Sequence, residues 1–158
     1  MPKLIKNGDI IDNPHTWLEN SDQAVTSNSL VAAQTWLAEQ ETIGEVAGIW
    51  LDAGDGIEIL QGVDLTQFDV IGVYFPAFTD GRGFSYARLL KERLHYQGDI
   101  RALGNFIPDQ LGYLIRVGFN SFQFNDDIDL DKALELYKPF SAAYQGDTSQ
   151  PKPLFLRR

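Results

Sequence analysis

Short apolar segments alternate with amphipathic segments through most of this chain, and this alternation constrains the fold more than any other feature. Four short segments with apolar runs are predicted as strands: Glu45–Asp52, Asp69–Pro76, Asp99–Asn105 and Asn120–Asn125. Three segments with helical spacing separate or follow them: Ser85–Tyr96, Pro108–Gly118 and Asp129–Tyr144. Strands that are connected through helices pair in parallel by right-handed crossovers. We therefore predict an α/β fold with a mostly parallel sheet of about four strands, either flavodoxin-like or a partial β/α barrel.

The N-terminal region precedes this repeat and is predicted to form a β-hairpin followed by a helix. Asn7-Gly8 separates two short apolar–polar runs, and this dipeptide accepts the positive φ angles of a tight turn. Ser27–Gln40 has helical spacing of apolar residues and a serine that can cap its start. Between the first two predicted strands, Ala53–Phe68 fits either a loop with a short helix or a small hairpin at Gly54–Gly56, and we favour the loop.

The length of the chain is sufficient for one domain. With 158 residues it can bury a sizeable core, and we predict a single α/β domain over residues 1–145. Residues 146–158 contain Pro151 and Pro153, which disfavour a helix, so we predict an extended C-terminal tail. Its apolar Leu154–Leu156 and basic end suit packing on a second copy of the chain, and a frayed terminus is the alternative.

Composition excludes several classes of site and partner. The chain has no cysteine, which excludes disulfides, thiolate metal sites and thiol redox chemistry, and its two histidines are far apart in sequence. No metal-ligand cluster, nucleophile triad or cofactor fingerprint is found, so we predict no metal site and identify no cofactor. A net charge of −9 argues against nucleic-acid binding. Neither a membrane-spanning run nor a signal peptide is found, which predicts a cytoplasmic protein that does not enter membranes.

The stretch "FPAFTDGRGFSYARLL" from Phe75 to Leu90 is the candidate site, because it passes from a strand through a glycine-flanked arginine into a helix. Glycines let a ligand approach the backbone, and the free N–H groups at a helix start attract anions. Arginines supply planar, charged forks, and Arg101 joins them if its side chain faces the same edge of the sheet. The predicted ligand-binding residues, for a small oxyanion or a phosphate-bearing cofactor, are Thr79, Gly81, Arg82, Gly83, Ser85, Arg88, Arg101 and Gln110.

Two aspartates complete the candidate site. Asp80 lies in the same loop, and Asp109 follows the next strand, so the carboxyl ends of neighbouring parallel strands bring both to one edge. Either is a candidate catalytic acid–base group. The alternative is structural, with Arg82 paired to Asp80 or Asp109 to make the loop rigid. The sequence leaves open whether the chain is an enzyme.

A second acidic motif does not fit a calcium loop. Asp127, Asp129 and Asp131 stand at alternate positions, but lysines occupy the places of the required glycine and glutamate. We interpret these acids as charges at a helix N-terminus.

The segment from Phe75 to Phe119 contains a set of residues that match one family pattern: Phe75, Phe78, Asp80-Gly81-Arg82-Gly83, Phe84-Ser85, Ala87, Arg93, Gly98-Asp99-Ile100-Arg101-Ala102, Gly104, Asp109-Gln110 and Gly118-Phe119. On these residues the segment resembles a bacterial family of unknown function that is often labelled an oxidoreductase of sulfite reduction. Val117 stands where the family often has cysteine and Lys91 where it usually has arginine, and the first departure weakens any thiol-based chemistry.

The resemblance implies a context in assimilatory sulfate reduction, beside a sulfite reductase haemoprotein. We therefore expect an accessory protein of sulfite reduction that acts with this haemoprotein. The alternative is an oxidoreductase-like enzyme that binds a small anion or phosphate-bearing cofactor at the Asp80-Gly81-Arg82-Gly83 loop.

Overall fold

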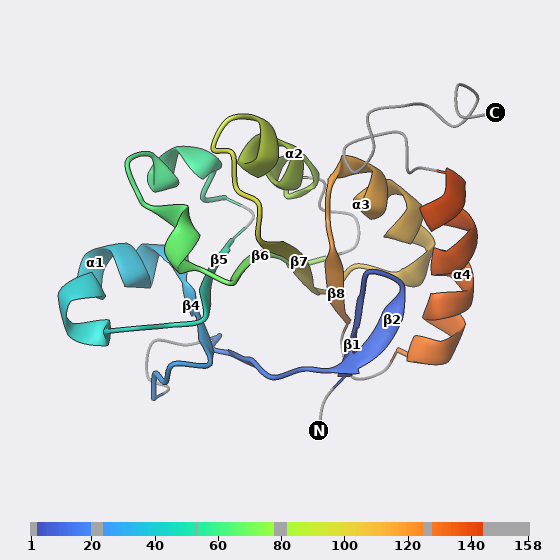
Figure 1. Ribbon diagram of the computed structural model, residues 1–158, viewed down its shortest axis with the longest axis horizontal. Helices are drawn as coiled ribbons and strands as arrows, with labels where there is room; N and C mark the ends of the chain where they lie inside the picture. Colours follow the sequence, from blue (N-terminus) through green and yellow to red (C-terminus); the bar gives the residue numbers. More distant parts are fainter. Residues whose placement is uncertain (1–2, 20–23, 53, 78–81, 125–127, 144–158) are drawn as a thin grey trace.

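In the computed structural model, the protein has an α/β fold with one curled sheet (Figure 1). It describes residues 3–19, 24–52, 54–77, 82–124 and 128–143, with the backbone alone for 137–143. The strands are β1 (Lys3–Lys6), β2 (Asp9–Asp12), β3 (Thr16–Trp17), β4 (Ser29–Ala32), β5 (Gly48–Leu51), β6 (Val70–Phe75), β7 (Asp99–Gly104) and β8 (Ser121–Phe124). The helices are α1 (Ala33–Ile43), α2 (Phe84–Glu92), α3 (Leu111–Val117) and α4 (Leu130–Ala143), with short 3₁₀ helices η1 (Ile57–Leu60), η2 (Leu65–Gln67) and η3 (Pro108–Gln110).

The sheet is larger than predicted and it is mixed. The described residues form eight strands in the order β2-β1-β8-β7-β6-β5-β4-β3. Strands β3 to β8 are parallel neighbours in sequence order, whereas β1 pairs antiparallel with both β2 and β8. The predicted number of about four strands was wrong because the N-terminal region adds strands at both edges of the sheet. The predicted parallel pairing is confirmed for β5 to β8.

The strand order decides between the two architectures considered for the sequence. A flavodoxin-like sheet reverses its strand order at a switch point, and no reversal occurs from β3 to β8. Continuous winding in one direction is the pattern of a β/α barrel. Because right-handed crossovers that advance in one direction all pass over the same face, the helices collect on that face.

Most local predictions are confirmed. The hairpin forms with Asn7 and Gly8 at φ 52° and 89°, and the segment before β6 is a loop with the short helices η1 and η2. Gly118 ends α3 with φ 119°. The Asp129 carboxylate accepts from the Asp131 backbone N–H at 3.0 Å, as expected of an acid at the start of a helix.

The predicted helix at Ser27–Gln40 was wrong in its first part. Ser29–Ala32 is strand β4, and the helix begins only at Ala33. Leu30 and Val31 are buried, and the segment pairs in parallel with β3 and β5. The pairing on both sides overrides a weak local preference for helix.

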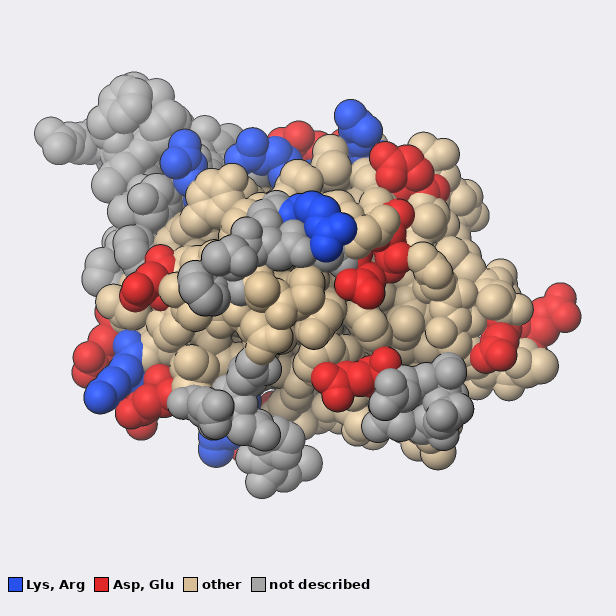
Figure 2. Space-filling view, turned by 180° about the vertical axis from the view of Figure 1, so that it is seen from behind, with Lys and Arg blue, Asp and Glu red and all other residues tan. Residues whose placement is uncertain are grey.

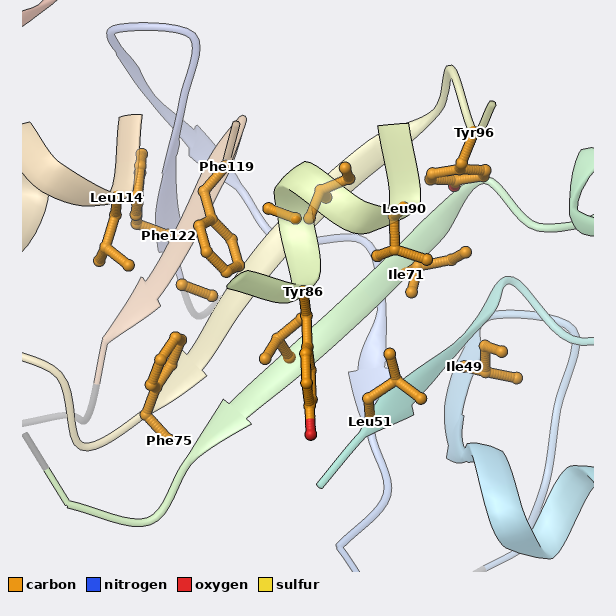
Figure 3. Close-up of a cluster of buried hydrophobic side chains, with 14 of the residues drawn as sticks. Ile49, Leu51, Ile71, Phe75, Tyr86, Leu90, Tyr96, Leu114, Phe119 and Phe122 are labelled. Carbon is orange, nitrogen blue, oxygen red and sulfur yellow. The ribbon is translucent and has the colours of Figure 1, made fainter. Parts of the chain in front are cut away.

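The helix-covered face of the sheet holds the main core (Figure 3). In β6, Ile71, Val73 and Phe75 point to this face, and α2 places Tyr86 and Leu90 over the strands. Helices α1, α3 and α4 add buried residues to the same cluster. The Tyr86 hydroxyl also accepts a hydrogen bond from the Gly56 N–H at 3.0 Å, which connects α2 to the segment before η1.

The opposite face carries a smaller and partly polar cluster. Leu30, Trp50, Val70 and Leu103 point to it, because successive side chains along a strand alternate between faces. Gly48 also lies on this side, where a Cβ would come within 1.9 Å of the Val70 carbonyl oxygen. Any side chain at this position would therefore push β5 away from β6.

Candidate functional site

The loops that follow β6 and β7 leave the sheet at neighbouring positions on its carboxyl edge. Phe75 and Gly104, the last residues of the two parallel strands, are paired. Asn105 ties the two loops together, since its backbone N–H donates to Phe75 O and its side-chain amide donates to Pro76 O, both at 2.8 Å. The two loops that carry predicted site residues, after β6 and after β7, therefore begin side by side at the carboxyl edge of the sheet.

Part of the predicted site lies outside the described residues. Thr79, Asp80 and Gly81 belong to this part, so the predicted catalytic role of Asp80 stays a prediction. Arg82 is exposed, and a Cβ placed on Gly54 would lie 3.8 Å from its Nη1 atom. The Arg82 guanidinium thus reaches towards the segment that follows β5.

Gly83 has a packing role in the structure. It is the residue before α2, with φ −79°, an angle that any residue adopts. A Cβ at Gly83 would come within 2.9 Å of both Val73 and Phe75 on β6. The glycine allows the start of α2 to lie directly on the sheet, which fixes the helix that carries Ser85 and Arg88.

The remaining edge residues lie on the surface around α2 and η3. Ser85 and Arg88 are exposed on α2, and Asp109 is exposed in η3. The Gln110 side-chain oxygen accepts from the Ile107 N–H at 3.0 Å and so stabilises the start of η3.

Arg101 lies away from these residues. It is 1% exposed, in the middle of β7, and points to the face of the sheet opposite the helices. Its Nε donates to Ser121 Oγ at 3.2 Å, Nη1 to Asn13 Oδ1 at 3.3 Å, and Nη2 to Asp99 Oδ2 at 3.3 Å. His15 Nδ1 lies 3.4 Å from Nη2. The structure therefore does not bring Arg101 together with Arg82 and Arg88.

We call Arg101, Asp99, Ser121, Asn13 and His15 the buried arginine network. Ser121 Oγ donates to the Asp99 carboxylate at 2.9 Å, and Lys6 Nζ lies 3.9 Å from Asp99 Oδ2. The network joins β7 and β8 to the segment between β2 and β3, so it holds that segment against the sheet.

Burial and charge shift the ionisation of this region. Burial lowers the pKa of Arg101, while the neighbouring Asp99 carboxylate opposes the shift. Burial and the Arg101 charge also lower the pKa of His15, so its imidazole is neutral at neutral pH. Burial raises the pKa of Tyr96, and Asp99 and Asp69 add to this effect. A neutral His15 can accept the hydrogen bond from Arg101, whereas a protonated one cannot.

Sequence reasoning missed the network, although one signal was present. Asp99 and Arg101 are charged residues two positions apart in an otherwise apolar strand, so they share a face. That spacing indicates a buried pair. Its partners Asn13 and His15 come from a distant segment and could not be found from the local pattern.

An aromatic group lies beside the network on the same face of the sheet. Trp17 packs against Trp50 and Tyr74, with ring centroids 6.0 and 5.4 Å apart. Trp50 Nε1 donates to Leu18 O at 3.0 Å, whereas the buried Trp17 Nε1 has no hydrogen-bond partner among the described residues. These rings close the face of the sheet that the helices leave open.

Among the described residues, no group of three or more histidine, cysteine, aspartate or glutamate side chains could hold a metal ion. No helix in the described part of the chain is both long and apolar enough to cross a membrane. The predicted C-terminal tail, residues 146–158, is outside the described residues.

Comparison with known proteins identifies the family. A family model described as "Bacterial protein of unknown function (DUF934)" matches residues 48–155, from β5 onward, and the chain belongs to this family. Neither the curated proteins nor the solved structures gave a significant match. The family resemblance predicted from the sequence is confirmed at this level.

Proposed function

We propose that this member of a bacterial family of unknown function is an accessory protein of assimilatory sulfite reduction that binds the sulfite reductase haemoprotein. The sulfite context comes from the resemblance of the Phe75–Phe119 segment to proteins labelled in that way. The observation that favours a binding role is an exposed surface over α2 and α3.

This α2–α3 surface consists of Arg88, Glu92, Tyr113 and Arg116, which are all exposed. Tyr113 is 51% exposed, and its ring packs edge-on against Phe84 with centroids 5.1 Å apart. Arg88 follows Phe84 by one helical turn and Arg116 follows Tyr113 by one turn, so each arginine is on the same side of its helix as the ring. Figure 2 shows basic side chains along the upper edge of the molecule, where Figure 1 places α2 and α3, with acidic side chains between and beside them.

The composition of the surface supports a protein partner. Tyrosine and arginine are enriched among residues that dominate binding energy at protein interfaces. The two arginines outnumber the one glutamate of this surface, whereas the chain as a whole has a net charge of −9. A partner with acidic groups around an apolar pocket would complement it.

The test is binding of the purified chain to the purified haemoprotein by calorimetry at low and high salt. We expect binding that weakens with salt, because exposed charges are screened. Tyr113→Ala and Arg88→Ala should each weaken binding roughly tenfold or more. Lys3→Ala, an exposed cation on β1, is the matched control and should bind like the wild type. Absence of binding at every salt concentration would disprove the proposal.

A genetic test addresses the pathway separately. A strain that lacks the gene should fail to grow on sulfate as sole sulfur source and should recover when supplied with sulfide. Normal growth on sulfate would remove the sulfite-reduction context while leaving the α2–α3 surface to be explained by another partner.

The second candidate function is binding of a small anion at the carboxyl edge. It is favoured by the exposure of Arg82, just before α2, and of Ser85 in its first turn. In a titration with sulfate or phosphate followed by NMR, the amide resonances of residues 82–88 should shift. Arg82→Lys keeps the charge and loses the planar fork, so it should weaken this binding. Equal binding by the variant would count against this candidate.

A further inference from the structure

A pocket of about 660 Å³ lies at the amino ends of β6 and β7, the opposite edge of the sheet from the predicted site loops. One wall is the segment 60–68, which contains η2 and leads into β6. The other wall is the segment 94–98, which connects α2 to β7. Its volume is within the range of about 300–1,000 Å³ that is typical of small-molecule sites.

The floor of this amino-edge pocket is apolar and well packed. Leu60, Leu65, Phe68 and Tyr96 belong to the buried core and are each at most 7% exposed. The Tyr96 hydroxyl donates to the Phe68 carbonyl oxygen at 3.0 Å, which joins the two walls beneath the pocket. Val63 and Leu94, which also line the pocket and are partly exposed, offer apolar contacts to a ligand above this floor.

The backbone of the second wall has an uncommon conformation. His95 has φ 57°, a left-handed angle that costs free energy for a residue with a side chain. The next residue, Tyr96, donates its N–H to Leu90 O at 3.0 Å and turns its ring into the floor. The strained residue therefore places His95 at the rim and Tyr96 beneath it.

The rim is polar, and the residues that line the pocket include neither arginine nor lysine. Its exposed side chains are Asp64, Thr66, His95 and Gln97. The Thr66 side chain and backbone N–H both donate to Asp64, and these hydrogen bonds lower the pKa of the Asp64 carboxyl. The carboxylate is therefore charged at neutral pH and repels anions at the mouth of the pocket.

We propose that the amino-edge pocket binds a small organic ligand whose buried part is a flat apolar ring and whose exposed end is neutral or positively charged. The apolar floor favours an apolar ring in the buried part of the ligand. The Asp64 carboxylate, on a rim without lysine or arginine, disfavours a negatively charged end. The site is separate from the α2–α3 surface and from the carboxyl edge, so it does not depend on either candidate function.

The test uses three probes that share a naphthalene ring and differ in charge: 1-naphthylmethylamine, 1-naphthalenemethanol and 1-naphthoic acid. Each is titrated into the full chain labelled with ¹⁵N, and amide shifts are followed by NMR. We expect saturable shifts in residues 60–68 and 94–98, with the acid binding roughly tenfold more weakly than the amine.

Two tryptophan variants test the location. Gln97→Trp adds a bulky ring at the rim and should abolish the binding of the alcohol probe. Gln61→Trp makes the same change at an exposed residue that does not line the pocket, and it should bind normally. If Gln97→Trp fails to fold, Thr66→Trp blocks the pocket from the other wall.

Asp64→Asn tests the charge. It should weaken binding of the amine roughly threefold while leaving binding of the alcohol unchanged. The proposal is overturned if none of the probes shifts the two walls, if the acid binds as well as the amine, or if Gln97→Trp and Gln61→Trp behave alike.

Discussion

At the residue scale, the most constrained group is the buried arginine network. Arg101 and Asp99 are 1% and 8% exposed; Arg101 donates to Ser121, Asn13 and Asp99, and the Asp99 carboxylate accepts from Arg101 and Ser121. A buried ion pair adds less stability than its geometry suggests, because both charges lose hydration. Removing one partner is costly, however, because the other charge stays buried.

A double-mutant cycle tests this pair. Asp99→Asn leaves Arg101 buried without its counter-charge and should reduce the free energy of unfolding by roughly 3–5 kcal/mol. The double variant Asp99→Asn/Arg101→Met should be clearly more stable than the sum of the two single changes implies. Urea denaturation of the four proteins measures this, and additive losses would show that the pair does not act as a unit.

The stability of the protein should depend on pH through His15. Burial and Arg101 lower the His15 pKa below its ordinary value of 6.5, with a smaller contribution from Lys6, while Asp69 and Asp99 oppose this shift. The unfolded chain then binds the proton more readily, so the contribution of His15 is complete above about pH 6.5 and is lost as the pH falls through the lowered pKa. Melting temperatures between pH 5 and 8 measure the effect, and His15→Gln should flatten the curve in this window. An unchanged curve would contradict the assignment.

At the element scale, a capping glycine correctly predicted where a helix ends, whereas the spacing of apolar residues did not correctly predict where a helix begins. Gly118 was predicted to stop a helix, and it does so with φ 119°. Helical spacing at Ser27–Gln40 was misleading, because Leu30 and Val31 also fit a strand that is buried on both faces. A cap is a local property of one residue, whereas the choice between helix and strand depends on the neighbouring strands.

Substitution of Gly118 tests the importance of the cap. Gly118→Ala forces a side chain into the left-handed region and should destabilise the protein by about 1–2 kcal/mol. The added Cβ would lie 3.4 Å from Lys91 Cδ, a flexible side chain, so crowding contributes little. Gly118→Asn tolerates this backbone better and should lose less stability. Chemical denaturation of both variants makes the comparison, and equal losses would point to crowding as the cause.

At the scale of the whole molecule, we expect the sheet to be most resistant to local unfolding at its central strands. Strands β6 and β7 are the longest and pair along their full length, whereas β3 has two residues at one edge and β2 forms the other edge. Helices cover one face, and the segment from Asn13 to Leu18 contacts the other through Arg101 and Trp50.

Hydrogen exchange should follow this gradient. The amides of Ile71–Tyr74 and Ile100–Leu103 should exchange slowest, because they open only when the sheet unfolds. Amides of β2 and β3 should exchange faster by orders of magnitude. Two-dimensional NMR after transfer to D₂O measures the rates, and uniform protection across all eight strands would contradict the gradient.

The sequence by itself determined the α/β class, the positions of β5 to β8 and of α2 to α4, and the N-terminal turn. These features depend on periodicity, glycines and caps, which act over a few residues. It also placed the loops after β6 and β7 at one edge, since parallel strands end together.

Only the tertiary structure decided the eight-stranded order and the inward direction of Arg101. It also decided the pocket at the amino edge. All three depend on contacts between segments far apart in the chain, such as Asn13 with Arg101 and Phe68 with Tyr96, and no local pattern carries such contacts.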